Sequence, residues 1–417
     1  MIQTLLPFNA LAAITAAARS AALSFVAPGP AAAPHGADAA ATADGRHDAA
    51  APTLAERREE PGFALGWDHA RHGLTPPLDL LPVGSPLRQG WLAAQAVAGQ
   101  RTLPARPAQR LWLALRLRAW QQGQAFEAVQ LTPGFLARLD TAQCPASRRP
   151  LRPLLASGPA PDAPGTPTGQ GRISRLNPAA AYAGGNLAVL DAELAEARGT
   201  LEFDALWAQA QRLAAGECSA LRGFDAATWL RLALLASFAT PLPHGQAASL
   251  PLVVLPPNRV RLVNPVQGLQ LMLTLQFTHG GYARRLLELS ALMPGHETRQ
   301  AFQIFMHTML ARRLAAGAGA GPADLRRALE DSWTDPLVQR RWQRLALRLT
   351  AADCERLLQR AAQRGLMVGG GRWLDAQAAT EGWALRAGDD AQARSGMGAC
   401  SARPGNARKR GSQKLAS

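Results

Sequence analysis

The spacing of apolar residues predicts helices over much of this chain. Apolar positions recur at helical intervals in residues 106–126, 203–215 and 224–239, and through most of 281–365. The first of these segments carries leucines and tryptophans on one side and arginines around them. It is therefore either a basic face for nucleic acid or an ordinary surface helix with solvated arginines, and the second interpretation is the more common one.

Shorter apolar runs predict strands in two places. Residues 172–176 and 186–190 flank a loop that contains Pro, Gly and Asn, which predicts a β-hairpin. A helix follows, with Asp191 placed to cap it and Glu193 adding negative charge to its first turn. Residues 250–277 are rich in β-forming residues and are broken by Pro-Pro-Asn and Asn-Pro, so we expect two or three strands there.

These segments divide the chain into five parts. Residues 1–60 form an Ala/Pro-rich leader and linker and residues 387–417 a basic tail, and both are expected to be disordered because they contain few large apolar residues. Between them we expect a helical region over 61–129, a ββα module over 130–210, and a helical region with a small β-sheet over 211–386. The fold class predicted is α+β, predominantly helical, with disordered termini.

The first residues and the cysteines bear on where the protein acts. The start of the chain is apolar, but it lacks a basic n-region and Arg19 interrupts it, so we expect a leader, with a signal peptide as the alternative. No other segment approaches about 20 uninterrupted apolar residues, so no membrane span is expected. The four cysteines are isolated and form no CxxC pair, which predicts a reducing cytoplasm and no thiolate zinc site.

The net charge is strongly positive. The chain has 45 Lys and Arg residues against 30 Asp and Glu, which gives +15 at pH 7. Its only lysines are Lys409 and Lys414, and the abundance of Ala, Gly and Pro indicates a GC-rich genome that favours Arg codons. The preference for Arg is thus weak evidence for phosphate recognition, whereas the charge itself attracts polyanions such as DNA.

The hairpin and helix resemble a known family. Residues 172–199, RISRLNPAAAYAGGNLAVLDAELAEARG, are similar to the core of HNH endonucleases of the phage-type branch. The matching positions are Arg175, Pro178, Tyr182, Gly185, Asn186 and, in place of a closing Lys, Arg198. Upstream, the entry motif C-x-x-[ST]-G-x-P-L is matched by Cys144, Ser147, Pro150 and Leu151, with Arg148 in place of Gly. The resemblance covers about 130–210.

The resemblance implies a nuclease that has lost its catalytic groups. HNH hydrolysis uses one divalent metal and a general base. The catalytic positions fall on Ser174, Arg175, Asn186 and Ala195. Ser174 brings no charge to a metal, Ala195 cannot ligate, and Arg175 stays protonated, although the phage-type branch often has Arg at that position. No histidine lies between residues 73 and 243. Asn186 corresponds to the family's central Asn, which braces the loop.

Three functions remain open. The first is nucleic-acid binding by an inactive HNH-like protein, of bacterial mobile-element origin, with Arg172, Arg175 and Arg198 contacting phosphates and no cofactor. For each of these arginines taken singly, a solvated position on the ββα surface is the slightly more common explanation. The second is an active endonuclease that holds Mg²⁺ or Mn²⁺ among rearranged acidic ligands, namely Asp191, Glu193 and Glu196. The third is a structural or interaction protein without a nucleic-acid role.

Several other polar residues are weaker candidates. His69 and His72 lie beside Asp68, and His244 and His279 are expected in loops, but no nucleophile or carboxylate spacing accompanies them, so we interpret them as structural. A hairpin over 365–374 after the last helix would suit a winged helix. That arrangement would place three arginines near DNA: Arg356, Arg360 and Arg364.

Overall fold

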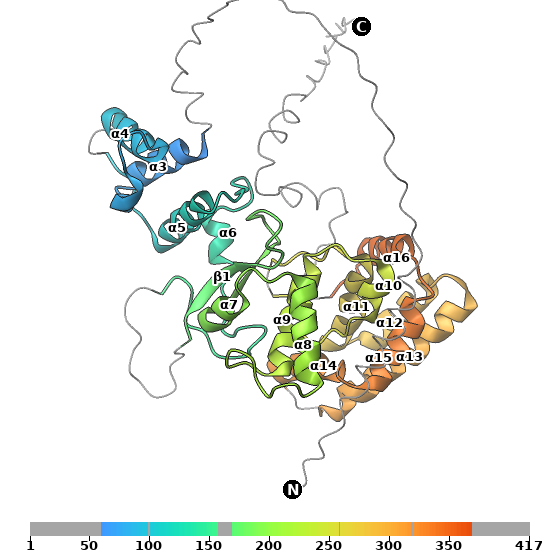
Figure 1. Cartoon of the computed structure of the whole chain (residues 1–417). Helices are drawn as coiled ribbons and strands as arrows, with labels where there is room; N and C mark the ends of the chain where they lie inside the picture. Colours follow the sequence, from blue (N-terminus) through green and yellow to red (C-terminus); the bar gives the residue numbers. More distant parts are fainter. Residues whose placement is uncertain (1–59, 99–100, 157–168, 258, 318–320, 369–417) are drawn as a thin grey trace, which may run out of the picture.

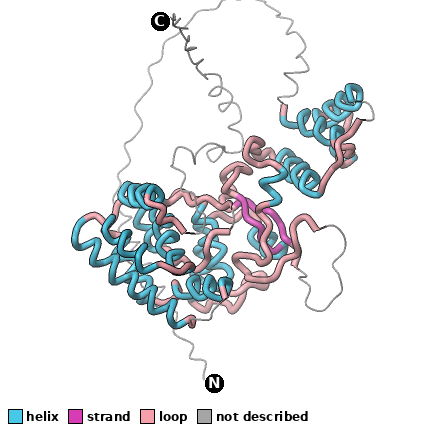
Figure 2. The backbone as a smooth tube through the Cα atoms, turned by 180° about the vertical axis from the view of Figure 1, so that it is seen from behind, coloured by secondary structure: helices cyan, strands magenta, loops and turns pink. Residues whose placement is uncertain are grey.

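The computed structural model is mostly helical with one small sheet. It describes residues 60–98, 101–156, 169–257, 259–317 and 321–368. Within these ranges a single two-stranded antiparallel sheet accompanies the helices (Figures 1 and 2), which confirms the predicted predominantly helical α+β class. The predicted leader and basic tail, and most of the predicted hairpin over 365–374, lie outside the described residues. No described helix has the length and apolar character needed to cross a membrane.

Two helices form a small N-terminal unit, α3 (Pro61–Arg71) and α4 (Pro86–Ala98), with the short 3-10 helix η1 (Leu78–Leu80) between them. Their backbones touch at Gly66 and Gly90. A Cβ atom on Gly66 would lie 1.9 Å from the backbone oxygen of Leu87, and one on Gly90 would lie 2.0 Å from that of Phe63. Only glycine fits at both positions, so the crossing of α3 and α4 is fixed by these two residues.

The predicted basic helix is α5 (Pro107–Gln121), which begins with proline at its first turn. Leu113, Leu115 and Leu117 are buried, whereas Arg110 and the N-cap residue Arg106 are exposed. Leu113 and Leu117 pack with the α3–α4 unit, whereas Leu115 belongs to the core of the larger body. Helix α5 therefore joins the two parts of the molecule, as Figure 1 shows, and the short helix α6 (Pro133–Ala137) follows it.

The predicted ββα module is present. Strand β1 (Gly171–Arg175) pairs antiparallel with β2 (Leu187–Asp191), and α7 (Ala192–Arg198) follows directly. Every residue of β2 is buried, which explains its apolar sequence. The Asp191 side chain accepts a hydrogen bond from the backbone N–H of Glu193 and so caps α7 as predicted.

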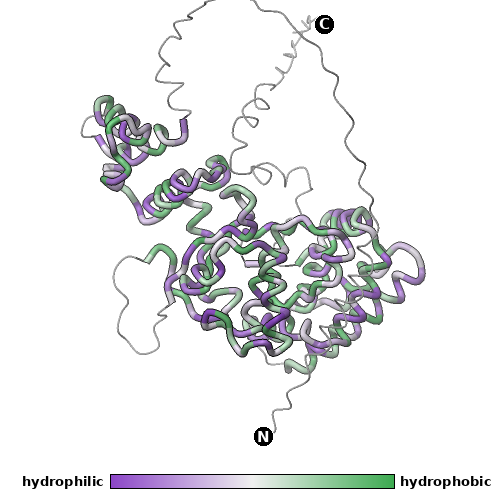
Figure 3. The backbone as a smooth tube through the Cα atoms, in the orientation of Figure 1, coloured by the Kyte–Doolittle hydropathy of each residue, from purple (hydrophilic) through white to green (hydrophobic). Residues whose placement is uncertain are grey.

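Nine α-helices and one 3-10 helix make up the larger body within the described residues. They are α8 (Phe203–Ala214), α9 (Ala226–Phe238), α10 (His244–Ser249), α11 (Pro265–Leu275), η2 (Gln276–Thr278), α12 (Tyr282–Leu292), α13 (Gly295–Ala315), α14 (Pro322–Ser332), α15 (Pro336–Ala346) and α16 (Ala351–Gln363). Both hydrophobic and hydrophilic residues occur along these helices (Figure 3), as expected for amphipathic packing around a common core. Its largest fully buried side chains include Trp229, Trp333 and Trp342.

The strands predicted over 250–277 are wrong. Residues 250–255 are a buried segment and 260–263 a half-buried one, neither pairs with a strand in the described part, and 265–275 are helix α11. Pro265 starts this helix. The Asn264 side chain donates to the backbone oxygens of Ser237 and Thr240 and to Gln267, so Asn-Pro is a helix start and not a turn between strands.

Candidate functional site

The loop between β1 and β2 is braced from inside by Asn186. This side chain is fully buried. Its Oδ1 accepts from the backbone N–H of Asn177 at 2.8 Å, and its Nδ2 donates to the backbone oxygens of Asn177 at 3.0 Å and Ala181 at 2.9 Å. Asn186 thus ties both ends of the loop together, which is the role that the resemblance implies for this position.

Arg175 supports the same loop. Its Nη1 donates to the backbone oxygens of Pro178 and Ala180 at 2.8 and 2.9 Å, and to Gln124 Oε1 at 2.6 Å. The guanidinium lies over the Tyr182 ring, 4.8 Å from its centre. Burial lowers the pKa of Arg175 from its usual value, but an arginine remains charged at neutral pH. Most of its hydrogen-bonding capacity at Nη1 serves the loop and not solvent.

Arg198 is buried, which the sequence did not reveal. Its side chain is 3% exposed and donates to the backbone oxygens of Arg175 and Leu176. Burial, together with the nearby charge of Arg175, lowers the pKa of Arg198 to about 10. From this position the guanidinium does not reach a phosphate in solvent. We therefore correct the expected interface by removing Arg198 from it and assign the residue to the support of β1.

Arg172 is the predicted arginine that faces solvent. It is exposed on β1, opposite Leu190 in the strand pair. Among the described residues, no carboxylate lies within ion-pair distance of it. Ser174 lies on the same strand opposite Ala188 and is half-buried. Of the three arginines predicted to contact phosphate, Arg172 alone is exposed, and Ser174 supplies no charged group beside it.

The acidic residues of the module are engaged by Arg149. Its Nη1 lies 2.7 Å from Glu193 Oε2 and 3.5 Å from Asp191 Oδ2. Glu196 is exposed, and Ala195 packs against the core. Across the described ranges, no three His, Cys, Asp or Glu side chains are grouped so that they could hold a metal ion. A metal at Asp191 and Glu193 would have to displace Arg149.

The upstream motif forms a tight turn in which Arg148 has a left-handed backbone, with φ of 58°. This is the position where the resembling family has glycine, which adopts that conformation without strain. The backbone N–H of Arg148 donates to the oxygen of Cys144 at 2.8 Å. Its side chain reaches α14, where Nη2 lies 3.2 Å from Glu330 Oε2 and 2.6 Å from Asp331 Oδ1. Arg148 thus links the module to the larger body.

The candidate histidines and the arginines of α16 form no shared site in the part of the chain that the structure describes. His69 is buried against the backbone oxygen of Leu65, and burial lowers its pKa. Asp68 pairs with Arg116. His244 contacts the backbone oxygen of Ala346, and His279 follows η2 and not a strand. On α16 (Ala351–Gln363), Arg356 pairs with Asp353 and Arg360 is exposed, as is Arg364 directly after the helix.

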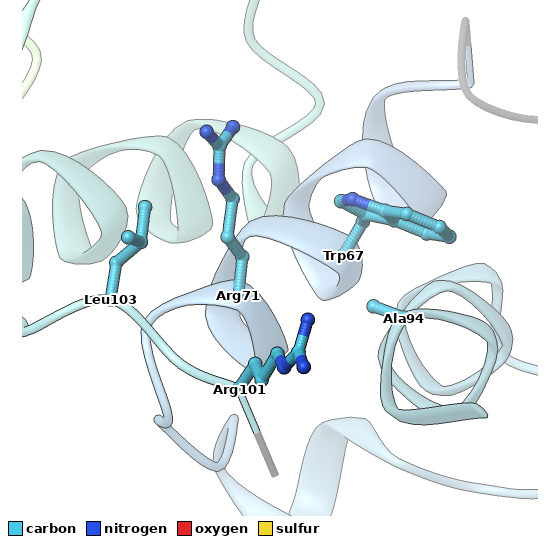
Figure 4. Close-up of a pocket in the computed structure, with 5 residues that line it drawn as sticks. All are labelled: Trp67, Arg71, Ala94, Arg101 and Leu103. Carbon is cyan, nitrogen blue, oxygen red and sulfur yellow. The ribbon is translucent and has the colours of Figure 1, made fainter. Parts of the chain in front are cut away.

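A hollow beside α3 was not foreseen from the sequence. It has a volume of about 280 Å³ and is lined by Trp67, Arg71, Ala94, Arg101 and Leu103 (Figure 4). These residues come from α3, from α4 and from the segment before α5, so no local motif signals their proximity. An aromatic ring and two guanidinium groups thus surround one opening.

No known family, curated protein or solved structure matches this chain. The likeness to HNH endonucleases therefore stays a resemblance carried by the residues of 130–210.

Proposed function

We propose that the protein binds nucleic acid through exposed arginines and that its ββα module is a scaffold without hydrolytic chemistry. One observation carries the proposal. Arg106, Arg110 and Arg172 are exposed, and within the described ranges none of them pairs with a carboxylate. In a chain of net charge +15, exposed and unneutralised guanidinium groups favour phosphate as a ligand.

The position of α5 supports a binding surface that α5 and the ββα module share. The end of this helix adjoins the ββα loop, because the backbone N–H of Tyr182 donates to the oxygen of Ala125 at 2.9 Å and Gln124 contacts Arg175. A helix of 15 residues is about 22 Å long at 1.5 Å per residue. The arginines at the start of α5 and the arginine on β1 are thus far enough apart to contact several successive phosphates.

The residues at the catalytic positions support binding without cleavage. Ser174 and Ala195 supply no charged ligand to a metal ion. Asp191 and Glu193 are already ion-paired with Arg149. No cofactor belongs to this proposal.

A reducing, cytoplasmic setting is also part of the proposal. Cys144 and Cys354 are buried free thiols, and burial raises the pKa of Cys354 to about 12, so this thiol does not react readily at neutral pH.

The test is DNA binding by the full chain at about 50 and 200 mM salt. Three phosphate contacts on duplex DNA predict an affinity loss of about 40-fold over this range. Binding that is absent, or that does not change with salt, would refute the proposal and favour a structural or interaction protein.

Plasmid nicking in the same samples tests the scaffold role. With Mg²⁺ or Mn²⁺ present we expect no nicking. Nicking that EDTA abolishes, and that the double variant Asp191→Ala/Glu193→Ala loses, would instead identify an active metal-dependent endonuclease.

A further inference from the structure

The hollow beside α3 combines two kinds of recognition group. Trp67 offers an aromatic surface, and Arg71 and Arg101 offer guanidinium groups, while Ala94 and Leu103 complete the walls. In Figure 4, Arg101 extends toward Ala94, and Arg71 rises from α3 between Leu103 and Trp67. None of the five lining residues is acidic. Such a combination suits a ligand that is both aromatic and anionic.

The walls of the hollow are held in place before any ligand arrives. The close approaches of Gly66 to Leu87 and of Gly90 to Phe63 fix α3 against α4, and therefore fix Trp67 relative to Ala94. Trp67 also stacks on Phe63, with ring centres 6.3 Å apart. The backbone N–H of Leu103 donates to the oxygen of Arg71 at 2.8 Å, which ties the segment before α5 to the end of α3. Stacking on Trp67 would therefore cost little ordering of the ring, whereas the exposed side chains of Arg71 and Arg101 become ordered when the ligand binds.

We propose that this hollow binds an unpaired base of single-stranded nucleic acid. The base stacks on Trp67, and the phosphates on either side of it contact Arg71 and Arg101. This inference rests on the proposed function and adds that the nucleic acid is single-stranded. Stacking on an aromatic side chain accepts any base, but it requires a free base face, which a continuous duplex does not offer.

The path of the chain supports a strand as the ligand over a free nucleotide. Arg101 and Leu103 lead directly into α5, whose exposed Arg106 and Arg110 belong to the proposed interface. A strand whose base occupies the hollow can therefore place its neighbouring phosphates near the guanidinium groups of Arg106 and Arg110. A free mononucleotide would make only the contacts inside the hollow.

The first experiment compares a labelled single-stranded oligothymidylate of about 12 residues with a duplex of the same length, using fluorescence anisotropy and the full chain. Trp67→Leu is expected to weaken single-strand binding roughly 5- to 100-fold, since one base–aromatic stack is lost. Duplex binding should change less than about twofold, and Trp67→Phe, which keeps a ring, should retain most of the single-strand affinity.

A matched control exists on α8. Trp207 stacks on Phe203 with ring centres 6.2 Å apart, in the same i and i+4 arrangement as Phe63 and Trp67, and it is also half-buried. Trp207→Leu should leave single-strand affinity unchanged. An equal loss in Trp67→Leu and Trp207→Leu would overturn the inference.

The arginines are tested through salt dependence. The double variant Arg71→Gln/Arg101→Gln should lower the slope of log affinity against log salt by about 1.4, the value for two phosphate contacts on a single strand. Arg212→Gln is the control, because this exposed arginine pairs with Glu217. A slope that is unchanged in the double variant would refute phosphate contact at the hollow.

A second variant keeps the inference testable where Trp67→Leu unfolds the N-terminal helices, as circular dichroism would reveal. Leu103 is 47% exposed at the rim of the hollow, so Leu103→Glu adds a repelling carboxylate without touching the α3–α4 contact. It should also weaken single-strand binding, and unchanged affinity would count against the hollow.

Competing ligands separate this inference from the proposed function. A polyglutamate of equal charge that competes as well as the oligothymidylate would show binding by charge alone, and thymidine monophosphate that binds as tightly as the strand would show a nucleotide site. Either result overturns the inference. Salt-sensitive binding that is unaffected by Trp67→Leu and Leu103→Glu refutes the inference and leaves the proposed function standing, whereas no binding to any nucleic acid refutes both.

Discussion

The ββα module and the N-terminal helices both contain many arginines, but they use them in opposite ways. In the module, Arg198 is buried and Arg175 is bonded to the backbone of its own loop. In the N-terminal helices, Arg106 and Arg110 are exposed on α5, and Arg71 and Arg101 line a hollow. Arg175 and Arg198 therefore serve the fold, whereas the arginines of the N-terminal helices, like Arg172 on β1, face possible ligands.

This difference shows why net charge is a poor guide to a binding surface. An arginine that donates to backbone oxygens has its guanidinium satisfied by the protein, so it adds to the formal charge but not to a phosphate site. Burial, and the presence of a carboxylate neighbour, decide which arginines are available. Mutating arginines in each region tests this distinction directly.

The largest effect is expected from Arg198→Met. Two buried backbone oxygens lose their donors, which costs about 1–3 kcal/mol each, while removal of a buried charge offsets part of that loss. We expect the free energy of unfolding to fall by about 2–4 kcal/mol in urea titration. Arg106→Met, at the exposed N-cap of α5, is the control and should change the free energy of unfolding by less than about 0.5 kcal/mol. Equal effects at the two positions would remove the contrast between the regions.

A smaller effect is expected from Arg148→Ala. The ion pairs with Glu330 and Asp331 are lost, so the free energy of unfolding should fall by about 1–2 kcal/mol. The left-handed backbone stays equally strained in wild type and in Arg148→Ala. Arg148→Gly loses the same ion pairs but accepts φ of 58°. Thermal unfolding should therefore place Arg148→Gly between Arg148→Ala and the wild-type protein. If the two variants unfold at the same temperature, the backbone conformation carries no cost.

The smallest effect on stability should come from Arg106→Gln/Arg110→Gln/Arg172→Gln. These side chains are exposed, so the free energy of unfolding should stay within about 0.5 kcal/mol of wild type. The salt slope of duplex binding should fall by about one for each phosphate contact removed. The control is Arg212→Gln/Arg284→Gln, since both of these exposed arginines pair with glutamates. If the triple variant keeps the wild-type slope of log affinity against log salt, the phosphate contacts lie on other residues.

The sequence predicted the ββα module closely because its signals are local. Two short apolar runs, a turn with Pro, Gly and Asn, and a capping Asp191 each act within a few residues. The strands lie at Gly171–Arg175 and Leu187–Asp191, one residue from the predicted 172–176 and 186–190. The HNH-like function of the module stays a prediction, because a ββα element without function has the same local pattern.

The sequence misled over 250–277 because the apolar residues of 265–275 are buried on a helix and not in a sheet. Leu269, Met272 and Leu273 lie on buried positions of helix α11, together with Gln267 and Gln270, whose amides find partners inside the core. The polar residues at these intervals masked the helical period. Tertiary partners, which a single segment cannot reveal, decided the outcome.

The candidate site was only partly predictable. The role of Asn186 followed from its place in the loop, but the burial of Arg198 depends on how α7 packs beneath β1. The hollow at Trp67 depends on the close crossing of α3 and α4 at Gly66 and Gly90. Both features arise from packing between elements and leave no signal in the surrounding sequence.

The link between Arg148 and α14 also bears on the order of folding. Arg148 and Glu330 are 182 residues apart in the chain. Contacts of such long sequence separation close a large loop, and they form after local structure such as the β1–β2 hairpin. The ion pairs would then be absent from the folding transition state, so Arg148→Ala should accelerate unfolding and leave the rate of folding nearly unchanged. Arg148 would thus slow the separation of the module from the larger body, and it would not change the rate at which the module folds.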